Sequence, residues 1–472
     1  MSFPTLQTTG TDALNDILRE PISRGSIPAT FIGATNARET IHFGSAGDKV
    51  YGKAEAGQVD ENTIVQLFSA TKAVTTVACV ILSDRGILSL DDPALIKQHL
   101  PELTDLEIFK GYDEDGNPMH VKRRNREITL RMLLSHTSGM SYAIYSDLTR
   151  QWVNERGNPR ILGGGGKRAT MQSLDFPLVY EPGTGWSYSP GLDWAGVLVE
   201  RVTGQDLESF FRENIFVPLR MTSTTFFPTD EVKSRLMSMT KGLPDRSIEC
   251  FPDNFESHNM PREGDPSKVG PLLAGGAGLY STARDFLALL RAILASGIQG
   301  KFRPEHAIIS KAGHDEMFRD VCASELTPDD PYSGKQKLLE IMDSTGYHDK
   351  ALLGDKSGSH VGHAIGLCLN LADSSNGRKA GSGCWDGVAK TPFWIDPTTG
   401  VAVRERLFIS RSTRPPKIAD AILHICTAIR LHDTISCLFT QGLCFTNIFQ
   451  GLPSPFVDTF VKFERTLYDH LQ

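Results

Sequence analysis

The stretch Phe68-Ser69-Ala70-Thr71-Lys72 opens an apolar segment that extends to about Arg85 and has the pattern of a long helix ending at Gly86. Serine and lysine three positions apart share one face of a helix, so the amine can reach the hydroxyl. A serine hydroxyl becomes a good nucleophile when a base takes its proton, and a buried lysine with a lowered pKa is such a base. The pattern predicts a nucleophilic Ser69 assisted by Lys72, and a serine cap followed by a solvated lysine is the simpler alternative.

The composition narrows the class of protein. The chain has 472 residues, enough for two or three domains or for one core with a large insertion. It is 40% apolar with a net charge of −7, and it holds no basic tract of the kind that neutralises phosphates. No apolar run approaches the roughly 20 residues of a membrane span, the cysteines are scattered singly, and the N-terminus lacks a signal-peptide pattern. We therefore expect a cytoplasmic enzyme with free thiols that binds neither nucleic acid nor membrane.

Strand patterns occur near both ends of the chain, and helical patterns fill the region between them. Residues 29–34 and 39–44 predict a hairpin, and residues 364–369 and 391–395 predict two further strands. A sheet built from both ends of the chain predicts one α/β domain interrupted by a helical one.

Two helices are predicted at the chain ends. Residues 11–20 have a helical apolar pattern, and Pro21 is expected to end that helix. The last segment predicts a helix that packs one face on a core. That face carries Phe456, Phe460, Phe463, Leu467 and Leu471.

Further motifs follow the Ser-x-x-Lys segment in order along the chain. They are Ser135-His136-Thr137-Ser138-Gly139, Tyr188-Ser189-Pro190, a helix over 194–204, Pro218-Leu219-Arg220-Met221 and Gly275-Gly276-Ala277-Gly278. Together they resemble the serine β-lactamase-like superfamily, in the branch of class C enzymes, related esterases and fungal polyketide transesterases. The resemblance extends from about residue 12 to about residue 402 and returns near the C-terminus.

The resemblance implies a β-lactamase/transpeptidase-like fold of the α/β (α+β) class. An antiparallel sheet flanked by helices would come from both chain ends, residues 1–100 and 355–472, with a mainly helical, loop-rich domain at 101–354 inserted between them. Residues 404–450 contain stretches that the family pattern does not match. We expect these to be atypical insertions or sequence read through unspliced gene segments.

The resemblance also implies roles for three side chains. Ser69 matches the acylated nucleophile, Lys72 its proton-accepting partner, and Tyr188 the tyrosine that relays protons to the leaving group and from the acceptor. A phenol beside a cationic amine is expected to have a lowered pKa and to work as a base. The family often has asparagine where Pro190 stands, which disfavours hydrolysis of β-lactams.

A third family motif matches the segment 381–388, which is expected on a strand at the edge of the site. Trp385 stands where penicillin-binding enzymes carry a lysine or histidine. The backbone at Gly387 and Val388 would contribute the second oxyanion N–H, with that of Ser69 as the first. Loss of the cation removes the partner of a substrate carboxylate and favours an uncharged acyl chain.

Several other patterns have simpler explanations. The glycine run 163–166 lacks the remaining residues of a phosphate loop and indicates a flexible loop. His360 and His363 lack a third metal ligand, so no metal site is expected. The long polar loop 241–271 is expected to rim the substrate site.

We conclude from the sequence that the chain is a serine acyltransferase or transesterase of secondary metabolism that needs no cofactor. Its partners would be a small-molecule acyl donor, as an ester, a thioester or an acyl group on a carrier protein, and an alcohol acceptor. A carboxylesterase or thioesterase with the same site is the first alternative. A catalytically silent binding protein of this fold is the second, because function depends on the site rather than on the fold. The missing signal peptide and third-motif cation disfavour a peptidoglycan enzyme.

Overall fold

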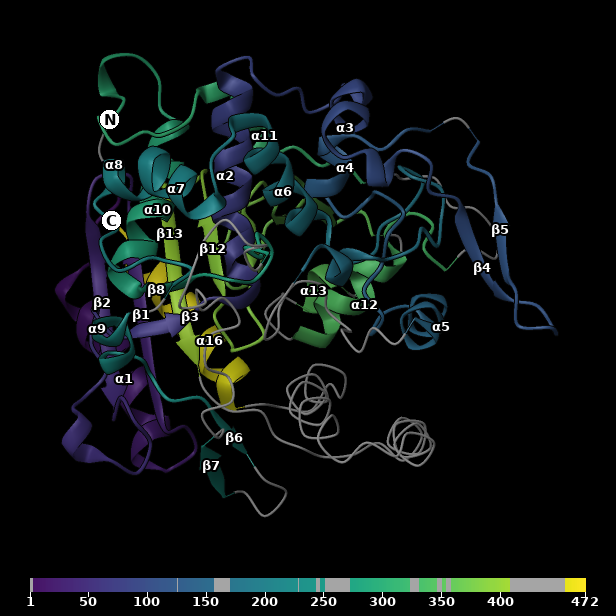
Figure 1. Ribbon diagram of the computed structural model, residues 1–472. Helices are drawn as coiled ribbons and strands as arrows, with labels where there is room; N and C mark the ends of the chain where they lie inside the picture. Colours follow the sequence, from purple (N-terminus) through teal and green to yellow (C-terminus); the bar gives the residue numbers. More distant parts are fainter. Residues whose placement is uncertain are drawn as a thin grey trace.

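Strands from the two ends of the chain form one antiparallel sheet (Figure 1). The computed structural model describes residues 3–124, 126–156, 170–227, 229–242, 247–250, 272–322, 331–345, 350–353, 358–407 and 455–472. The strand order is β2-β1-β13-β12-β11-β10-β9. The strands are β1 (Ala29–Thr35), β2 (Thr40–Gly47), β9 (Val361–His363), β10 (Cys368–Asn370), β11 (Gly383–Trp385), β12 (Phe393–Asp396) and β13 (Val401–Leu407).

The predicted hairpin is confirmed, since β1 and β2 pair in antiparallel register with Ile32 opposite Gly44. On its other side β1 pairs with β13, so that Ile32 also lies opposite Glu405. The first strand of the chain is therefore held between its neighbour in sequence and a strand some 370 residues later, as the register from Thr30↔Leu407 shows. This pairing explains why sheet-forming segments occur at both ends of the sequence.

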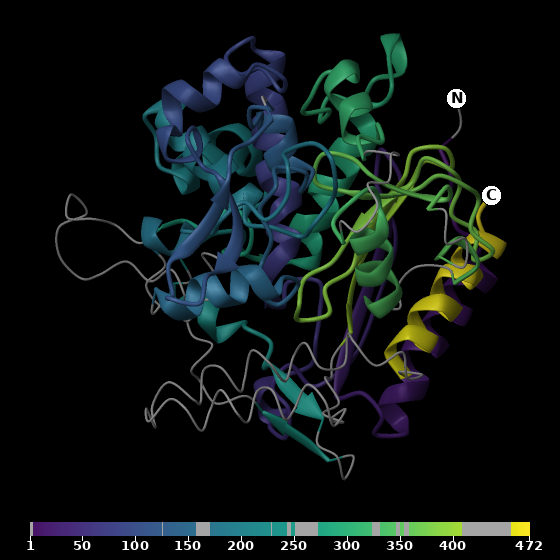
Figure 2. The same ribbon diagram turned by 90° about the vertical axis from the view of Figure 1, so that its right-hand side faces the viewer.

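Helices cover both faces of the sheet (Figure 2). α1 (Thr8–Ser23) and α16 (Pro455–Asp469) pack side by side on one face, where the Trp394 and Phe460 rings lie 5.2 Å apart. α10 (Ala283–Ser296) packs on the other face against β1 and β13, and α2 (Thr71–Asp84) lies among the helices on that side. In α16, Phe460, Phe463 and Leu467 are buried as predicted, whereas Leu471 lies beyond the end of the helix and is half-buried.

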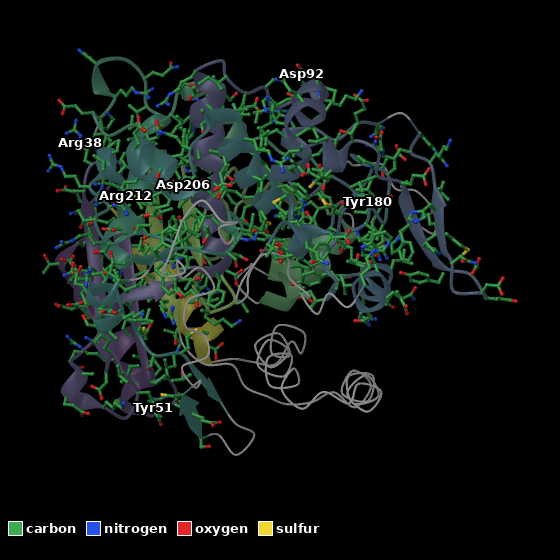
Figure 3. All side chains as sticks on the ribbon, in the orientation of Figure 1. Arg38, Tyr51, Asp92, Tyr180, Asp206 and Arg212 are labelled. Carbon is green, nitrogen blue, oxygen red and sulfur yellow. The ribbon has the colours of Figure 1, made fainter. Side chains whose placement is uncertain are left out.

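The region between β2 and β9 is mainly helical. Asp92 and Asp206, both labelled in Figure 3, accept hydrogen bonds from the first turns of α3 and α7. The helices here are α3 (Pro93–His99), α4 (Leu130–Leu134), α5 (Asp147–Glu155), α6 (Gly191–Thr203), α7 (Leu207–Phe211), α8 (Val217–Leu219), α9 (Asp230–Ser234), α11 (Lys311–Met317), α12 (Gln336–Thr345) and α13 (Lys350–Leu353). The short strands are β3 (Ile64–Gln66), β4 (Ile108–Tyr112), β5 (Pro118–Val121), β6 (Thr240–Gly242), β7 (Ile248–Cys250) and β8 (Tyr280–Thr282).

Two sequence predictions about element ends need correction. The first helix does not stop at Pro21, because α1 continues to Ser23 and Pro21 is buried on the same face as Leu14 and Leu18. The predicted strand 364–369 is wrong over its first half. Gly366 has a φ of +75°, so the chain turns there between β9 and β10 instead of running straight.

The boundary at residue 404 also needs correction. Residues 404–407 are not part of an insertion, because they form the end of β13 and pair with β1, and Arg404 also lies opposite Phe393 of β12. Three consecutive charged residues, Arg404, Glu405 and Arg406, stand there and are buried, which hides the strand from a hydrophobicity pattern. The rest of the expected insertion, the glycine run 163–166 and most of the loop 241–271 lie outside the described residues, and the domain boundaries stay predictions.

In the described parts of the chain, the helices are all too short or too polar to cross a membrane.

Candidate active site

Ser69 lies in the single turn of 3-10 helix, Phe68–Ala70, that leads into α2. The residue before it, Phe68, has a φ of +47°, a left-handed conformation that costs a non-glycine residue about 1–3 kcal/mol. The chain is held at this point from two sides. The N–H of Leu67 donates to the Leu279 carbonyl at 2.8 Å, and the Thr391 hydroxyl donates to the Leu67 carbonyl at 3.1 Å. The partly exposed Ser69 is thus fixed at the head of the helix.

Lys72 and Tyr188 both reach the Ser69 hydroxyl, as their motifs predict. The Tyr188 hydroxyl donates to Ser69 Oγ at 2.6 Å, and Lys72 Nζ donates to the same atom at 3.2 Å. Lys72 Nζ also donates to the Gly276 carbonyl at 2.8 Å and lies 4.8 Å from the centre of the Tyr188 ring. Lys72 of α2 and Tyr188 of the segment before α6 therefore meet at one serine oxygen, and the Gly276 carbonyl holds the lysine there.

Burial sets the charge states of the two partners. Desolvation lowers the pKa of Lys72 to about 8, against the opposing effect of the Asp193 and Asp386 carboxylates. The pKa of Tyr188 is raised well above its usual value by burial, although its hydrogen bond to Ser69 works the other way. The expectation that the amine lowers the pKa of the phenol is therefore wrong, because desolvation outweighs it. This site contains a neutral phenol and a lysine that loses its proton readily.

The third motif lies beside this triad. Trp385, the last residue of β11, is buried, and its ring lies edge-on to that of Tyr188 with centroids 5.2 Å apart. Gly387 packs on the segment before Ser69, since a Cβ there would lie 2.2 Å from the Leu67 carbonyl oxygen. The sequence predicts Val388 on the strand, but the structure places it in the turn after β11. The roles of Gly387 and Val388 in an oxyanion site stay predictions.

His136 belongs to the Ser135–Gly139 motif but is not among the site residues that the sequence predicts. Its ring centre lies 4.8 Å from that of Tyr188 and 6.0 Å from that of Trp385. Its Nδ1 accepts the Ser189 N–H at 3.3 Å, and its carbonyl accepts the hydroxyl of Tyr180, labelled in Figure 3, at 2.9 Å. Burial holds the pKa of His136 well below its ordinary value, so the imidazole is neutral. It braces the Tyr188 segment without adding charge.

Two tyrosines complete the lining around Tyr188. Tyr142 and Tyr145 have ring centres 5.0 Å and 5.9 Å from that of Tyr188. The Tyr142 N–H donates to the Tyr188 carbonyl at 2.9 Å, and the Tyr142 hydroxyl donates to Asp193 at 3.4 Å. No spacing rule connects these positions in the sequence, and only the folded chain brings them together. Together with Trp385 they form an aromatic wall around the ring of Tyr188, whose hydroxyl contacts the serine oxygen.

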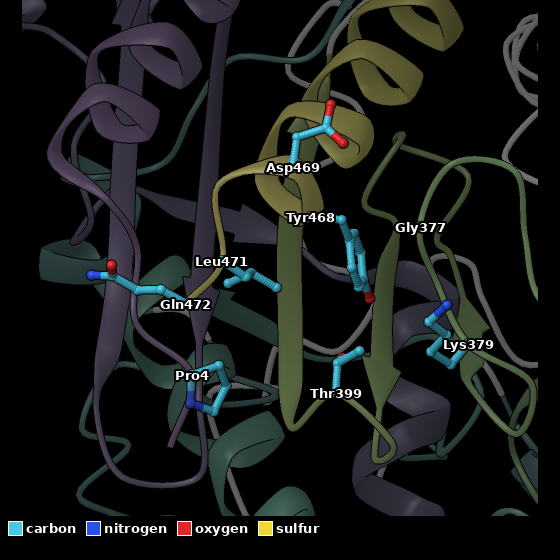
Figure 4. A pocket seen from close by; sticks show the side chains of 8 residues that line it. All are labelled: Pro4, Gly377, Lys379, Thr399, Tyr468, Asp469, Leu471 and Gln472. Atoms are coloured by element: carbon cyan, nitrogen blue, oxygen red, sulfur yellow. The ribbon is translucent and has the colours of Figure 1, made fainter. Parts of the chain in front are cut away.

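The remaining candidate sites do not share this chemistry. His363 packs its ring 5.5 Å from that of Trp385, and its Nδ1 is paired with the Ala364 carbonyl at 2.6 Å. Within the ranges that the structure describes, no group of three potential metal ligands occurs. Figure 4 shows a cavity of about 490 Å³ where the two chain ends meet, which has no lining residue in common with the Ser69 site. It is lined by Pro4, Gly377, Lys379, Thr399, Tyr468, Asp469, Leu471 and Gln472.

Comparisons with known proteins give matches over most of the chain. The family described as Beta-lactamase matches residues 14–404. A lovastatin esterase from Penicillium rubens is 30% identical over 380 residues, which are 79% of this chain and 87% of the relative. A monacolin J acid methylbutanoyltransferase from Aspergillus terreus is 35% identical over 392 residues, 81% of this chain and 87% of the relative.

The solved structures show the same fold at lower identity. A variant of simvastatin synthase from Aspergillus terreus superposes with a TM-score of 0.69 at 24% identity, covering 98% of this chain and 95% of the other. EstCE1, a hydrolase with promiscuous acyltransferase activity, gives a TM-score of 0.60 at 19% identity over 85% of this chain and 94% of the other.

Proposed function

The chain belongs to the β-lactamase family, and we propose on this basis that it is a serine acyltransferase that passes an acyl group through Ser69 to a small-molecule alcohol. One observation carries the proposal: Lys72 and Tyr188 both hydrogen-bond to Ser69 Oγ, at 3.2 Å and 2.6 Å. A nucleophile, a base of lowered pKa and a neutral proton donor on one oxygen are the parts that acyl transfer needs.

The first half of the reaction forms the acyl-enzyme. Neutral Lys72 takes the proton of Ser69 as Oγ attacks the carbonyl carbon of an ester or thioester. The oxygen of that carbonyl gains the negative charge, which the N–H groups of Ser69 and Val388 would stabilise. When the tetrahedral intermediate collapses, Tyr188 gives its proton to the leaving alcohol or thiol and regains one from Lys72. Both proton carriers are then back in their initial states.

The second half reverses these steps with a new alcohol. Neutral Lys72 first takes the phenol proton of Tyr188. The resulting tyrosinate takes the proton of the acceptor hydroxyl as the acceptor oxygen attacks the acyl carbon, and Ser69 Oγ leaves with the proton that Lys72 holds. Water at about 55 M competes with the alcohol, so transfer requires that the site orients the acceptor. The aromatic wall of Tyr142, Tyr145 and Trp385 supports an apolar site that favours an organic acceptor over water.

Names of the fungal relatives suggest the class of substrate. They describe an esterase of lovastatin and a methylbutanoyltransferase of monacolin J acid, so a polyketide alcohol and a short, uncharged acyl chain are the proposed substrates here. The donor would be an ester, a thioester or an acyl group on a carrier protein, and the proposed location is the cytoplasm. Because one relative is an esterase, hydrolysis at the same site is the second candidate function.

Product partitioning separates the two reactions. The enzyme is given a short acyl thioester while the concentration of a polyketide alcohol is raised, and acid and ester products are quantified by mass spectrometry. We expect ester to replace acid as the alcohol increases, with faster consumption of the thioester. Free acid as the sole product across a broad panel of alcohols would identify the enzyme as a hydrolase instead.

A further inference from the structure

Asp193, in the first turn of α6, is a buried carboxylate that no sequence motif singled out. Its Oδ1 accepts the N–H of Gly276 at 3.0 Å, and its Oδ2 accepts the Tyr142 hydroxyl at 3.4 Å. The carbonyl of the same glycine accepts the Lys72 ammonium at 2.8 Å. Gly276 therefore links Asp193 to Lys72 through its two backbone groups.

Gly276 fits this place because it has no side chain. A Cβ there would lie 2.7 Å from Oδ2 of Asp193 and 3.0 Å from both Cγ and Oδ1. Such distances are shorter than any normal contact, so the glycine allows the turn to approach the carboxylate closely enough for the hydrogen bond. The position of the carbonyl that holds Lys72 thus depends on the contact between Gly276 and Asp193.

The groups around Lys72 differ in charge. Asp193 from α6 and Asp386 from the segment after β11 both act on it as negative charges, and Asp193 has the larger effect. Tyr142 and Tyr188 are neutral because burial raises their pKa values, and His136 is neutral because burial lowers its own. Asp193 also shares a hydrogen-bonded neighbour, Gly276, with Lys72.

We propose that Asp193 is a positioning residue for acyl transfer, which holds Lys72 against Ser69 through Gly276 and balances the buried ammonium with its negative charge. The proposal rests on the proposed function, in which Lys72 is the base. It makes two separable claims: the charge of Asp193 stabilises protonated Lys72, and the fit of Gly276 orients it.

The charge is tested with Asp193→Asn, which keeps the shape and the acceptor for the Gly276 N–H. The readout is the pH dependence of covalent labelling of Ser69 by a fluorophosphonate. Without the carboxylate, protonated Lys72 is less stable, so its pKa falls and the acidic limb of the profile moves about one unit lower. Asp285→Asn is the matched control, because Asp285 is also buried and accepts a backbone N–H, from Ser223 at 2.7 Å, but is not among the charges that act on Lys72.

The fit is tested with Gly276→Ala, which changes no charge. Displacing the carbonyl leaves Lys72 misaligned, so kcat for ester cleavage should fall on the order of 10²-fold with little change in KM. Gly297→Ala is the control, since a Cβ there would also collide with a side chain, His314 at 2.9 Å, away from the site. Melting temperatures of all four variants separate this effect from a general loss of stability.

The outcomes distinguish this inference from the proposed function. An acidic limb that moves in Asp193→Asn but not in Asp285→Asn supports the inference. An unmoved limb, with Ser69 still labelled, would overturn it and leave the proposed function standing. A wild-type protein that is not labelled at Ser69 would overturn both.

Discussion

At the scale of single residues, we propose that the pKa of Lys72 determines when Ser69 can react. Burial lowers this pKa to about 8, and the lysine accepts the serine proton only in its neutral form. Acylation should therefore be slow in acid and rise with pH until it levels off above about 8, with Tyr188 still protonated because its pKa is raised. The measurement is kcat/KM for an activated ester against pH. A rate that is flat between about pH 6 and pH 9 would contradict this assignment of the base.

Lys72 and Tyr188 should behave as one unit because they share the Ser69 oxygen. Lys72→Ala and Tyr188→Phe are each expected to lower turnover by about 10²–10⁴-fold, the usual contribution of a general acid or base. The double variant should lose far less than the product of the two factors. Turnover of the two single variants and the double variant completes the cycle, and strictly multiplicative losses would indicate independent roles.

Residue types and their order were enough to predict Ser69, Lys72 and Tyr188, because a short helical spacing and a distant motif carry them. Asp193 and His136 could not be predicted, since their contacts depend on how α6 and the turn at 136 pack against α2. The direction of the Tyr188 pKa was wrong for a related reason. Burial is a property of the fold, and the sequence showed only the neighbouring amine.

At the scale of elements, the turn between β9 and β10 contacts the helix that carries Lys72. Gly366 has a φ of +75°, and a Cβ there would lie 2.2 Å from Thr76 Oγ1 on α2. Gly366→Ala adds a collision to the backbone strain, so it should lower the free energy of unfolding by clearly more than about 1 kcal/mol.

Gly381→Ala is the matched control, because Gly381 has a φ of +86° and open space around its Cα. It should cost only the strain, about 1 kcal/mol. Urea titrations of the two variants give the comparison. Equal losses would show that the turn does not pack on α2 as described. The sequence could not predict this turn, since an apolar run with one glycine reads as a continuous strand when the contacts that bend it are unknown.

At the scale of the whole molecule, a buried ion pair joins the C-terminal helix to the segment between β10 and β11. Arg378 Nε lies 2.6 Å from Glu464 Oε1, and both side chains are almost fully buried. Glu464→Ala would leave the arginine charge without this partner and should destabilise the protein by about 3–5 kcal/mol. Glu102→Ala breaks the exposed pair with Arg201 and should cost at most about 1 kcal/mol in the same urea titration. Similar losses in both variants would contradict the packing of α16.

The architecture was predictable from the sequence because sheet-like segments at both chain ends and the ordered motifs point to the same fold. The end of β13 was missed, since Arg404, Glu405 and Arg406 are buried charges within a strand, a pattern that hydrophobicity does not reveal. Pairing of all three with β1, and of Arg404 with β12 as well, makes these residues part of the sheet. Pairing between strands so distant in the sequence cannot be predicted from the local β propensity of the residues.

The central claim is that an acyl group is carried on Ser69. The most direct measurement is intact-mass analysis after reaction with a slowly turned-over acyl ester, followed by mapping of the modified peptide, on the wild type and on Ser69→Ala. We expect one added acyl group, located on Ser69, and none on the folded Ser69→Ala variant. An acyl group on another residue, or equal labelling of both proteins, would contradict the account.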